Sequence, residues 1–130
     1  MAISLSDTRV AVVGAGAVGS YFGGMLARAG AKVTLIGRLA HVDAILKNKL
    51  LMDTVSFTEH VSLRASTNLR DVRDAQSVLF CVKTIDTEKT AREIASHLVK
   101  DAIVVSLQNG VDNVARIHAA SGIDALPAVV

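Results

Sequence analysis

The stretch Val10-Ala-Val-Val-Gly-Ala-Gly-Ala-Val-Gly19 decides the fold. Val10 to Val13 is apolar and mostly β-branched, which is typical of a parallel strand covered by helices on both faces. In the Gly-x-Gly-x-x-Gly pattern that follows, Gly14 permits a tight turn, Gly16 lets a pyrophosphate approach the backbone, and Gly19 allows close helix packing. The helix N-terminus then offers unpaired N–H groups to the phosphates. The candidate pyrophosphate loop is Gly14, Ala15, Gly16, Ala17, Val18 and Gly19.

The residues after the loop supply the helix and second strand that this motif requires. Val18, Phe22, Met25 and Ala29 recur at helical spacing, and Gly30 stands where a helix C-cap is expected. A glycine-rich turn without a ligand is the alternative interpretation. The order of strand, motif, helix and second strand favours nucleotide binding. Farther along, the patterns predict strands at 32–36, 77–82, 102–107 and 126–130, and helices at 40–48, 86–99 and 111–120.

Two local details extend this prediction. Between 55 and 63 the odd positions are mainly apolar, which predicts a half-buried strand or a short hairpin, with Glu59 interrupting the pattern and marking the turn. On the helix over 86–99, Glu88 and Arg92 are four residues apart, and we expect them to pair on its solvent-facing side.

The alternation of strands and helices predicts an α/β fold: a Rossmann-type, doubly wound, mainly parallel sheet with helices on both faces. The 130 residues contain no linker or repeat and suit one domain. Because the last predicted strand, at 126–130, has no helix after it, we expect residues 1–130 to be an incomplete domain. A second, helical domain would then follow in the parent protein.

Composition and charge exclude several functions. The net charge of +2 includes no long basic run, so nucleic acid is not an expected partner. Residues 10–27 are uncharged, but their many glycines make them weakly hydrophobic for a membrane span. Residues 1–7 lack the pattern of a signal peptide, and Cys81 has no partner, so we expect a cytoplasmic protein. The four histidines lack metal-ligand spacing, and no metal site is expected.

The residue after the second strand points to the cofactor. NAD-preferring domains usually carry Asp or Glu there, where the carboxylate accepts hydrogen bonds from the ribose 2′-hydroxyl. This chain has Gly37-Arg38 instead. A guanidinium favours a 2′-phosphate through charge-assisted hydrogen bonds, which predicts NADP(H). The alternative is that Arg38 is a solvated residue before a helix.

Two further candidates follow later strands. Lys83 comes after the strand at 77–82, and Asn109 comes after the strand at 102–107. Because ligands of open α/β sheets bind at the carboxyl ends of the strands, Lys83 is positioned to neutralise cofactor charge and Asn109 to contact the nicotinamide ribose. Each also has an ordinary interpretation, since Asn-Gly is a common turn pair and Lys83 suits a surface charge.

Four segments together resemble the ketopantoate reductases (2-dehydropantoate 2-reductases). They are Gly14-Ala-Gly-Ala-Val-Gly-Ser-Tyr-Phe-Gly-Gly24, Leu35-Ile-Gly-Arg38, Val82-Lys-Thr84 and Ser106-Leu-Gln-Asn-Gly-Val111. The resemblance covers almost the whole chain. It implies an NADPH-binding Rossmann domain that a following helical domain completes for reduction of a 2-keto acid to a 2-hydroxy acid.

The resemblance also implies roles for individual residues. Arg38 and Lys83 are similar to contacts of the 2′-phosphate and the adenosine side, and Asn109 to the residue that positions nicotinamide and substrate. The proton-donating lysine of the family lies in the helical domain, so we expect no catalytic residue here beyond a supporting role for Asn109. Leu39 and Lys49 stand where many relatives have glycine, which leaves the shape of the second helix and its exit open.

Other functions remain as alternatives. One is a nucleotide-sensing regulatory Rossmann module, which Arg38 disfavours because such modules usually carry an acid there. Another is the cofactor domain of a different two-domain NADP dehydrogenase, acting on a hydroxyacid or a sugar phosphate. An exposed crevice or sheet edge would also allow the chain to form a homo-oligomer.

Overall fold

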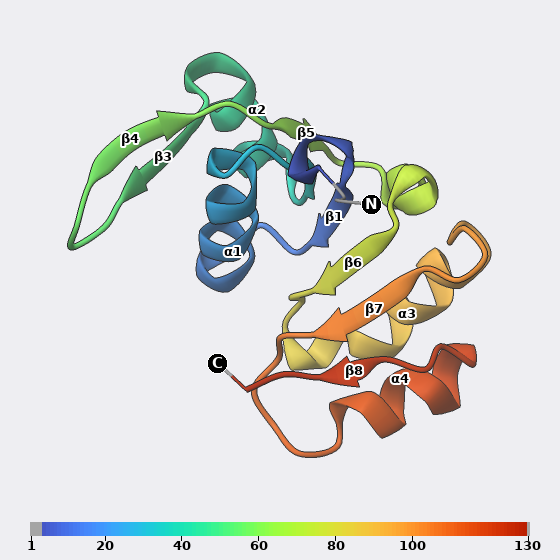
Figure 1. Ribbon diagram of the computed structural model, residues 1–130. Helices are drawn as coiled ribbons and strands as arrows, with labels where there is room; N and C mark the ends of the chain where they lie inside the picture. The colour runs from blue at the N-terminus through green and yellow to red at the C-terminus, as the bar shows by residue number, and fades with distance from the viewer. Residues whose placement is uncertain (1–3, 130) are drawn as a thin grey trace.

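A computed structural model describes residues 4–129. Its main sheet has six parallel strands in the order β5-β2-β1-β6-β7-β8, and β3 and β4 form a separate antiparallel hairpin (Figure 1). The elements are β1 (Arg9–Val13), α1 (Ala17–Arg28), β2 (Lys32–Ile36), α2 (Leu39–Asn48), β3 (Leu50–Asp53), β4 (Thr58–Val61), β5 (Arg64–Ser66), β6 (Ser77–Phe80), α3 (Thr87–Ala95), β7 (Ile103–Ser106), α4 (Asn113–Ser121) and β8 (Leu126–Pro127). Short 3₁₀ helices cover Leu5–Asp7, Leu69–Asp74 and Thr84–Asp86.

The predicted fold class is confirmed. β1 lies between β2 and β6, and its side chains alternate between two cores. Val10 and Val12 face the core that α1, α2 and the hairpin cover, whereas Ala11 and Val13 face the core beneath α3 and α4. A strand buried on both faces needs a continuous apolar run, which explains why this segment is apolar throughout. Residue 130, the end of the predicted last strand, lies outside the described residues, and β8 covers only Leu126–Pro127.

Glycines form the face of α1 that touches the sheet. Gly19, Gly23 and Gly24 are the buried residues of the helix. A Cβ on Gly23 would lie 2.9 Å from Val12 Cγ2, and one on Gly24 would lie 2.5 Å from Met52 Sδ. Because these side chains are absent, the α1 backbone lies close to β1 and the hairpin. Gly30, with φ of 110°, ends the helix as predicted.

The region at 50–66 differs from the prediction in three ways. The hairpin turn lies at Thr54–Phe57, where the Thr54 hydroxyl accepts hydrogen bonds from the backbone N–H groups of Ser56 and Phe57. Glu59 therefore does not mark the turn; it pairs with Met52 inside β4 and binds Arg28 of α1. Glu59 interrupts the apolar alternation without ending the strand, because its ion-pair partner, Arg28, lies 31 residues away in the sequence. Strand β3, at Leu50–Asp53, lies before the predicted range of 55–63, and the short edge strand β5 was not predicted at all.

The expected pair of Glu88 with Arg92 is also wrong. The Glu88 carboxylate accepts hydrogen bonds from Nε and Nη2 of Arg116 on α4, and the distance from Nη2 to Oε2 is 3.0 Å. Arg116 also donates to the Thr84 carbonyl at 2.8 Å, so its guanidinium is held between two elements. The α3 helix ends at Ala95, four residues before its predicted end at 99. The α4 helix begins at Asn113, two residues after its predicted start at 111.

Candidate functional site

The site begins at the turn from β1 into α1. Gly14 has φ of 113°, a conformation that residues with a side chain rarely adopt. A Cβ there would also lie 2.6 Å from the carbonyl oxygen of Cys81, which directly follows the neighbouring strand β6. Both facts require glycine at this position. The tight turn predicted from the sequence is confirmed.

The other two glycines of the loop serve different needs. Gly16 is the N-cap of α1 with φ of −75°, and a Cβ on it would meet nothing within 4 Å. A Cβ on Gly19 would lie 1.9 Å from the Gly14 carbonyl oxygen and 3.0 Å from Val12 Cγ1. Gly19 is therefore needed for packing, whereas the space at Gly16 is open to a ligand.

A cleft of about 530 Å³ opens at the carboxyl ends of β1, β2 and β6. The chain runs outward from β1 to β2 and β5, then returns to β6 on the other side of β1, so the strand order reverses between β1 and β6. Ligands of open α/β sheets bind where the order reverses. The cleft lies at that point and is lined by Gly14, Ala15, Gly16, Arg38, Lys83 and Thr90, among others.

Two exposed cations lie at the cleft. Arg38 is the N-cap of α2, and Lys83 precedes the 3₁₀ helix Thr84–Asp86. Neither forms an ion pair with any residue in 4–129. Their charges are therefore available to an anionic ligand. Asp86 also lines the cleft and is the acidic side chain closest in sequence to Lys83.

Cys81 lines the same cleft and is partly buried. Burial raises the pKa of its thiol to about 12, so the group is neutral at physiological pH. Within residues 4–129, no group of three or more His, Cys, Asp or Glu side chains is arranged to hold a metal ion. No helix in this range is long and apolar enough to cross a membrane.

Asn109 is placed apart from the other predicted site residues. It lines a separate hollow of about 410 Å³ at the carboxyl ends of β7 and β8, together with Gln108, Asn113 and Pro127. Its backbone carbonyl accepts a 2.8 Å hydrogen bond from Asn113 Nδ2. The structure thus brings the glycine loop, Arg38 and Lys83 to one cleft, with Asn109 at the hollow beside the next strand.

Three buried polar residues near the site were not predicted. Gln108, Thr87 and Thr90 are each at least nine-tenths buried. Thr90 lines the cleft, and Gln108 is hydrogen-bonded to Thr87. Gln108 belongs to a motif that the sequence singles out, but its burial depends on β6 and α3 lying beside β7. The spacing of Thr87 and Thr90, one helical turn apart, was the available signal.

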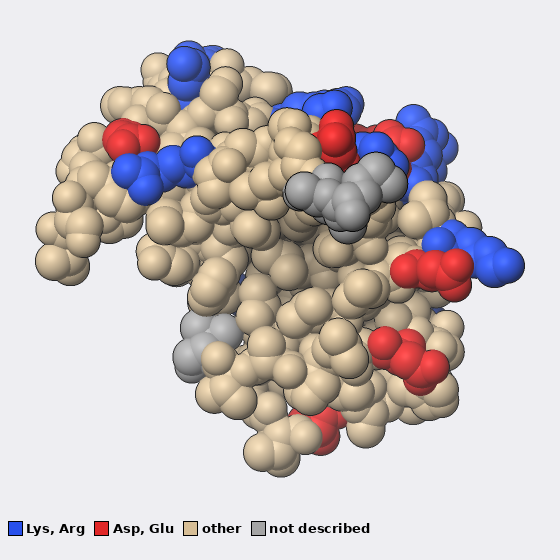
Figure 2. Space-filling model, in the orientation of Figure 1, with Lys and Arg blue, Asp and Glu red and all other residues tan. Residues whose placement is uncertain are grey.

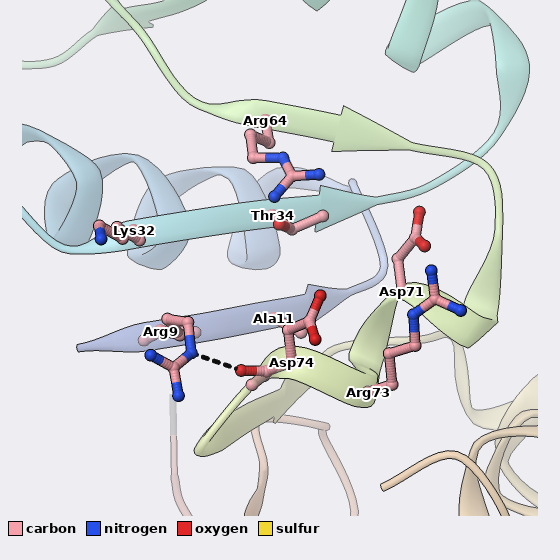
Figure 3. Close-up of a pocket in the computed structure, with 10 residues that line it drawn as sticks. Arg9, Ala11, Lys32, Thr34, Arg64, Asp71, Arg73 and Asp74 are labelled. Atoms are coloured by element: carbon pink, nitrogen blue, oxygen red, sulfur yellow. Dashed lines mark hydrogen bonds between the residues drawn. The ribbon is translucent and has the colours of Figure 1, made fainter. Parts of the chain in front are cut away.

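A second group of charged side chains lies at the opposite ends of the strands. Arg9, Lys32 and Arg64, the first residues of β1, β2 and β5, line a hollow of about 150 Å³ with Asp71 and Asp74 (Figure 3). Carboxylates among the cations reduce its attraction for an anion. In Figure 2 positive and negative side chains are likewise interspersed on this side of the molecule. This hollow is at the amino ends of the strands, away from the expected ligand side.

Taken in chain order, the strands of the main sheet follow the sequence 3-2-1-4-5-6, with a glycine loop after the first. That order and that loop define a Rossmann-type dinucleotide-binding fold. The model of the family "Ketopantoate reductase PanE/ApbA" matches residues 10–129. The chain belongs to the ketopantoate reductase family.

Individual relatives agree with this assignment. The chain is 34% identical over 114 residues to a 2-dehydropantoate 2-reductase of Pyrococcus horikoshii, covering 88% of this chain and 37% of that protein. A crystal structure of a PanE/ApbA family ketopantoate reductase from Ralstonia eutropha has 46% identity and a TM-score of 0.87, with 94% of this chain and 40% of that chain covered. A ternary structure of D-mandelate dehydrogenase with NADH and anilino(oxo)acetate has 27% identity and a TM-score of 0.81, over 94% and 40% of the two chains. The chain therefore spans less than half the length of these relatives.

Proposed function

We propose that residues 1–130 are the NADPH-binding domain of an oxidoreductase that reduces a 2-keto acid to a 2-hydroxy acid, with 2-dehydropantoate the favoured substrate. One observation carries the proposal. The open space at Gly16 and the unpaired cations Arg38 and Lys83 border a single cleft at the reversal of strand order. Family membership supplies the reaction class.

The residues present fit this cofactor. The Gly14–Gly19 loop and the N-terminus of α1 would bind the pyrophosphate, since the missing Cβ of Gly16 leaves room for it. Arg38 would donate hydrogen bonds to the 2′-phosphate, and Lys83 would add positive charge on the adenosine side. Asn109 would orient the nicotinamide end and the substrate. When bound, NADPH supplies the hydride.

Cofactor preference tests the proposal. NADPH should bind the chain more tightly than NADH, because only NADPH offers a 2′-phosphate to Arg38. Losing those charge-assisted bonds should cost about 1.5–3 kcal/mol, or about tenfold to a hundredfold in affinity. Calorimetric titration of both cofactors against the wild type and Arg38→Ala measures this. Arg73 lines the hollow at the amino ends of the strands, and Arg73→Ala, which removes the same charge there, should keep the preference. Equal affinity of the wild type for both cofactors would contradict the assignment of Arg38.

A second candidate function keeps the reaction class and changes the substrate or cofactor. The neighbouring D-mandelate dehydrogenase structure holds NADH and an oxo acid with an aromatic group. If this chain preferred NADH, a 2-keto acid dehydrogenase of that kind would become the better proposal. A regulatory nucleotide sensor receives no specific support from the structure.

The partners and location are proposals of the same kind. Figure 2 shows few charges over β7, β8 and α4. Ile103 of β7, Leu126 of β8 and Val111, between β7 and α4, are exposed. Since β8 is also a sheet edge, this face is our candidate for self-association of the isolated chain. We place the protein in the cytoplasm because its single cysteine suits a reducing compartment.

A further inference from the structure

Gln108 joins the two loops that carry Lys83 and Asn109. The residue is only 8% exposed, and its side chain makes three hydrogen bonds. Nε2 donates to the Val82 carbonyl at 3.1 Å and to Thr87 Oγ1 at 2.8 Å. Oε1 is 3.1 Å from the Ser106 hydroxyl, which donates to it. Every polar group of the amide therefore has a partner.

These bonds continue the contact between β6 and β7 beyond the end of the sheet. The last backbone hydrogen bond between the two strands runs from the Leu107 N–H to the Phe80 carbonyl, at 2.9 Å. Past this point the Gln108 side chain takes over and binds the carbonyl of Val82, the residue before Lys83. Gln108 itself is the residue before Asn109. One side chain thus links the bases of both loops.

The same amide also fixes the far end of the Lys83 loop. Thr87 is the first residue of α3 and is completely buried. Because Gln108 binds both Val82 and Thr87, it holds the two residues that flank the segment 83–86. Only an amide can make these contacts at this length, since glutamate has no N–H to donate and methionine has neither group.

We propose that Gln108 is a positioning residue that sets the Lys83 loop against the Asn109 loop so that one dinucleotide can contact both. This inference rests on the proposed function, because it assigns NADPH to the cleft. It predicts that the contribution of Lys83 to binding depends on Gln108. The contribution of Arg38, which caps α2 and forms no hydrogen bond with Gln108, should be independent of it.

A double-mutant cycle tests this dependence. The dissociation constant of NADPH is measured for the wild type, Gln108→Met, Lys83→Ala and the double variant. We expect Lys83→Ala to weaken binding about tenfold in the wild-type background and less than about twofold in the Gln108→Met background. The matched control replaces Lys83→Ala by Arg38→Ala. The effect of Arg38→Ala should be the same in both backgrounds. General destabilisation by Gln108→Met would instead alter the effects of Lys83→Ala and Arg38→Ala alike, or alter neither of them.

Each outcome decides the proposal. Equal effects of Lys83→Ala in the two backgrounds of a chain that binds NADPH overturn the role of Gln108 and leave the proposed function intact. A wild type that does not bind NADPH overturns the proposed function and this inference with it. If Gln108→Met does not fold, Thr87→Val replaces it in the cycle, because it removes one of the two acceptors of Nε2. The effect of Lys83→Ala should then fall by about half on a logarithmic scale, and an unchanged effect would again overturn the proposal.

Discussion

The three glycines of the loop differ in what requires them. Gly14 is needed for its backbone conformation, Gly19 for contact with the Gly14 carbonyl, and Gly16 for neither. The sequence motif alone assigns these roles by analogy, whereas the distances separate them. A substitution at Gly16 should therefore impair ligand binding and leave stability almost unchanged, whereas a substitution at Gly19 should lower stability.

Gly16→Val should abolish NADPH binding while leaving the melting temperature of the free chain within a few degrees of the wild type. The new side chain has open space and an ordinary φ in the free chain, but it would occupy the place of the pyrophosphate. Thermal unfolding and calorimetric titration check the two parts. Gly19→Ala is the contrasting variant and should lower the melting temperature strongly, since its Cβ meets backbone. Normal NADPH binding by Gly16→Val would show that the phosphate loop is misassigned.

Lys49 has an unfavourable backbone conformation at the exit of α2. Its φ of 63° and ψ of −179° lie in a region that is almost restricted to glycine. The family resemblance pointed to this position, because it implies glycine there. Lys49→Gly should raise the free energy of unfolding by about 1 kcal/mol, measured by denaturant titration. Lys47→Gly, inside the helix, should lower it by about 1 kcal/mol. A loss of stability in Lys49→Gly would contradict the assigned strain.

At the scale of elements, the sequence predicts best what is periodic and local. β1, α1, β2 and α2 agree with their predicted ranges within a residue or two. Strands β3 and β5 were missed, and the turn was placed at Glu59, whose ion-pair partner lies on α1. Arg28 stacks on the Phe57 ring at 3.9 Å and binds Glu59, which fixes the hairpin against α1. No pattern within the segment 50–66 reveals a partner on the first helix.

The ion pair between α3 and α4 predicts a pH dependence. The Arg116 guanidinium, through its hydrogen bonds to the carboxylate, lowers the pKa of Glu88 below its ordinary value of 4.5. The ion pair therefore stabilises the folded chain above pH 4.5. This stabilisation is lost as the pH falls through the lowered pKa that Glu88 has in the folded chain.

Glu88→Gln should therefore be less stable than the wild type at pH 7, and the difference should shrink as the pH approaches 3. Urea unfolding across this range measures it. Glu93→Gln, on the same helix and without an ion pair in residues 4–129, should show a much smaller difference. A gap between wild type and Glu88→Gln that stays constant with pH would contradict the role of the pair.

At the scale of the whole molecule, topology assembles the site from segments that the sequence keeps apart. The glycine loop, Arg38 and Lys83 meet because parallel strands end at the same edge of the sheet. That much follows from sequence reasoning. The separate position of Asn109, and the buried amide beside it, required the register of β6 on β7. Gln108 is buried because Val82 and Thr87 lie beside it in space. These neighbours are more than 20 residues away in the sequence, so no local pattern predicts the burial.

The chain alone should have no measurable reductase activity. Hydride transfer to a keto acid needs the carbonyl held against the nicotinamide and a proton donor within hydrogen-bond reach of the developing alkoxide. Asn109 is exposed at its hollow, and none of the residues lining that hollow is a lysine or any other charged side chain. Lys83 belongs to the other cleft, where we assign it to the cofactor. The relatives are more than twice as long as this chain, which leaves most of their residues to supply the donor and the cover over the site.

The measurement follows NADPH absorbance with 2-dehydropantoate and a panel of 2-keto acids. Calorimetric binding of NADPH by the same preparation is the control, because it separates a missing active site from a chain that does not fold. We expect binding without oxidation of the cofactor. Turnover of about 1 per second or more, comparable to ordinary enzymes, would show that the proton donor lies within these 130 residues.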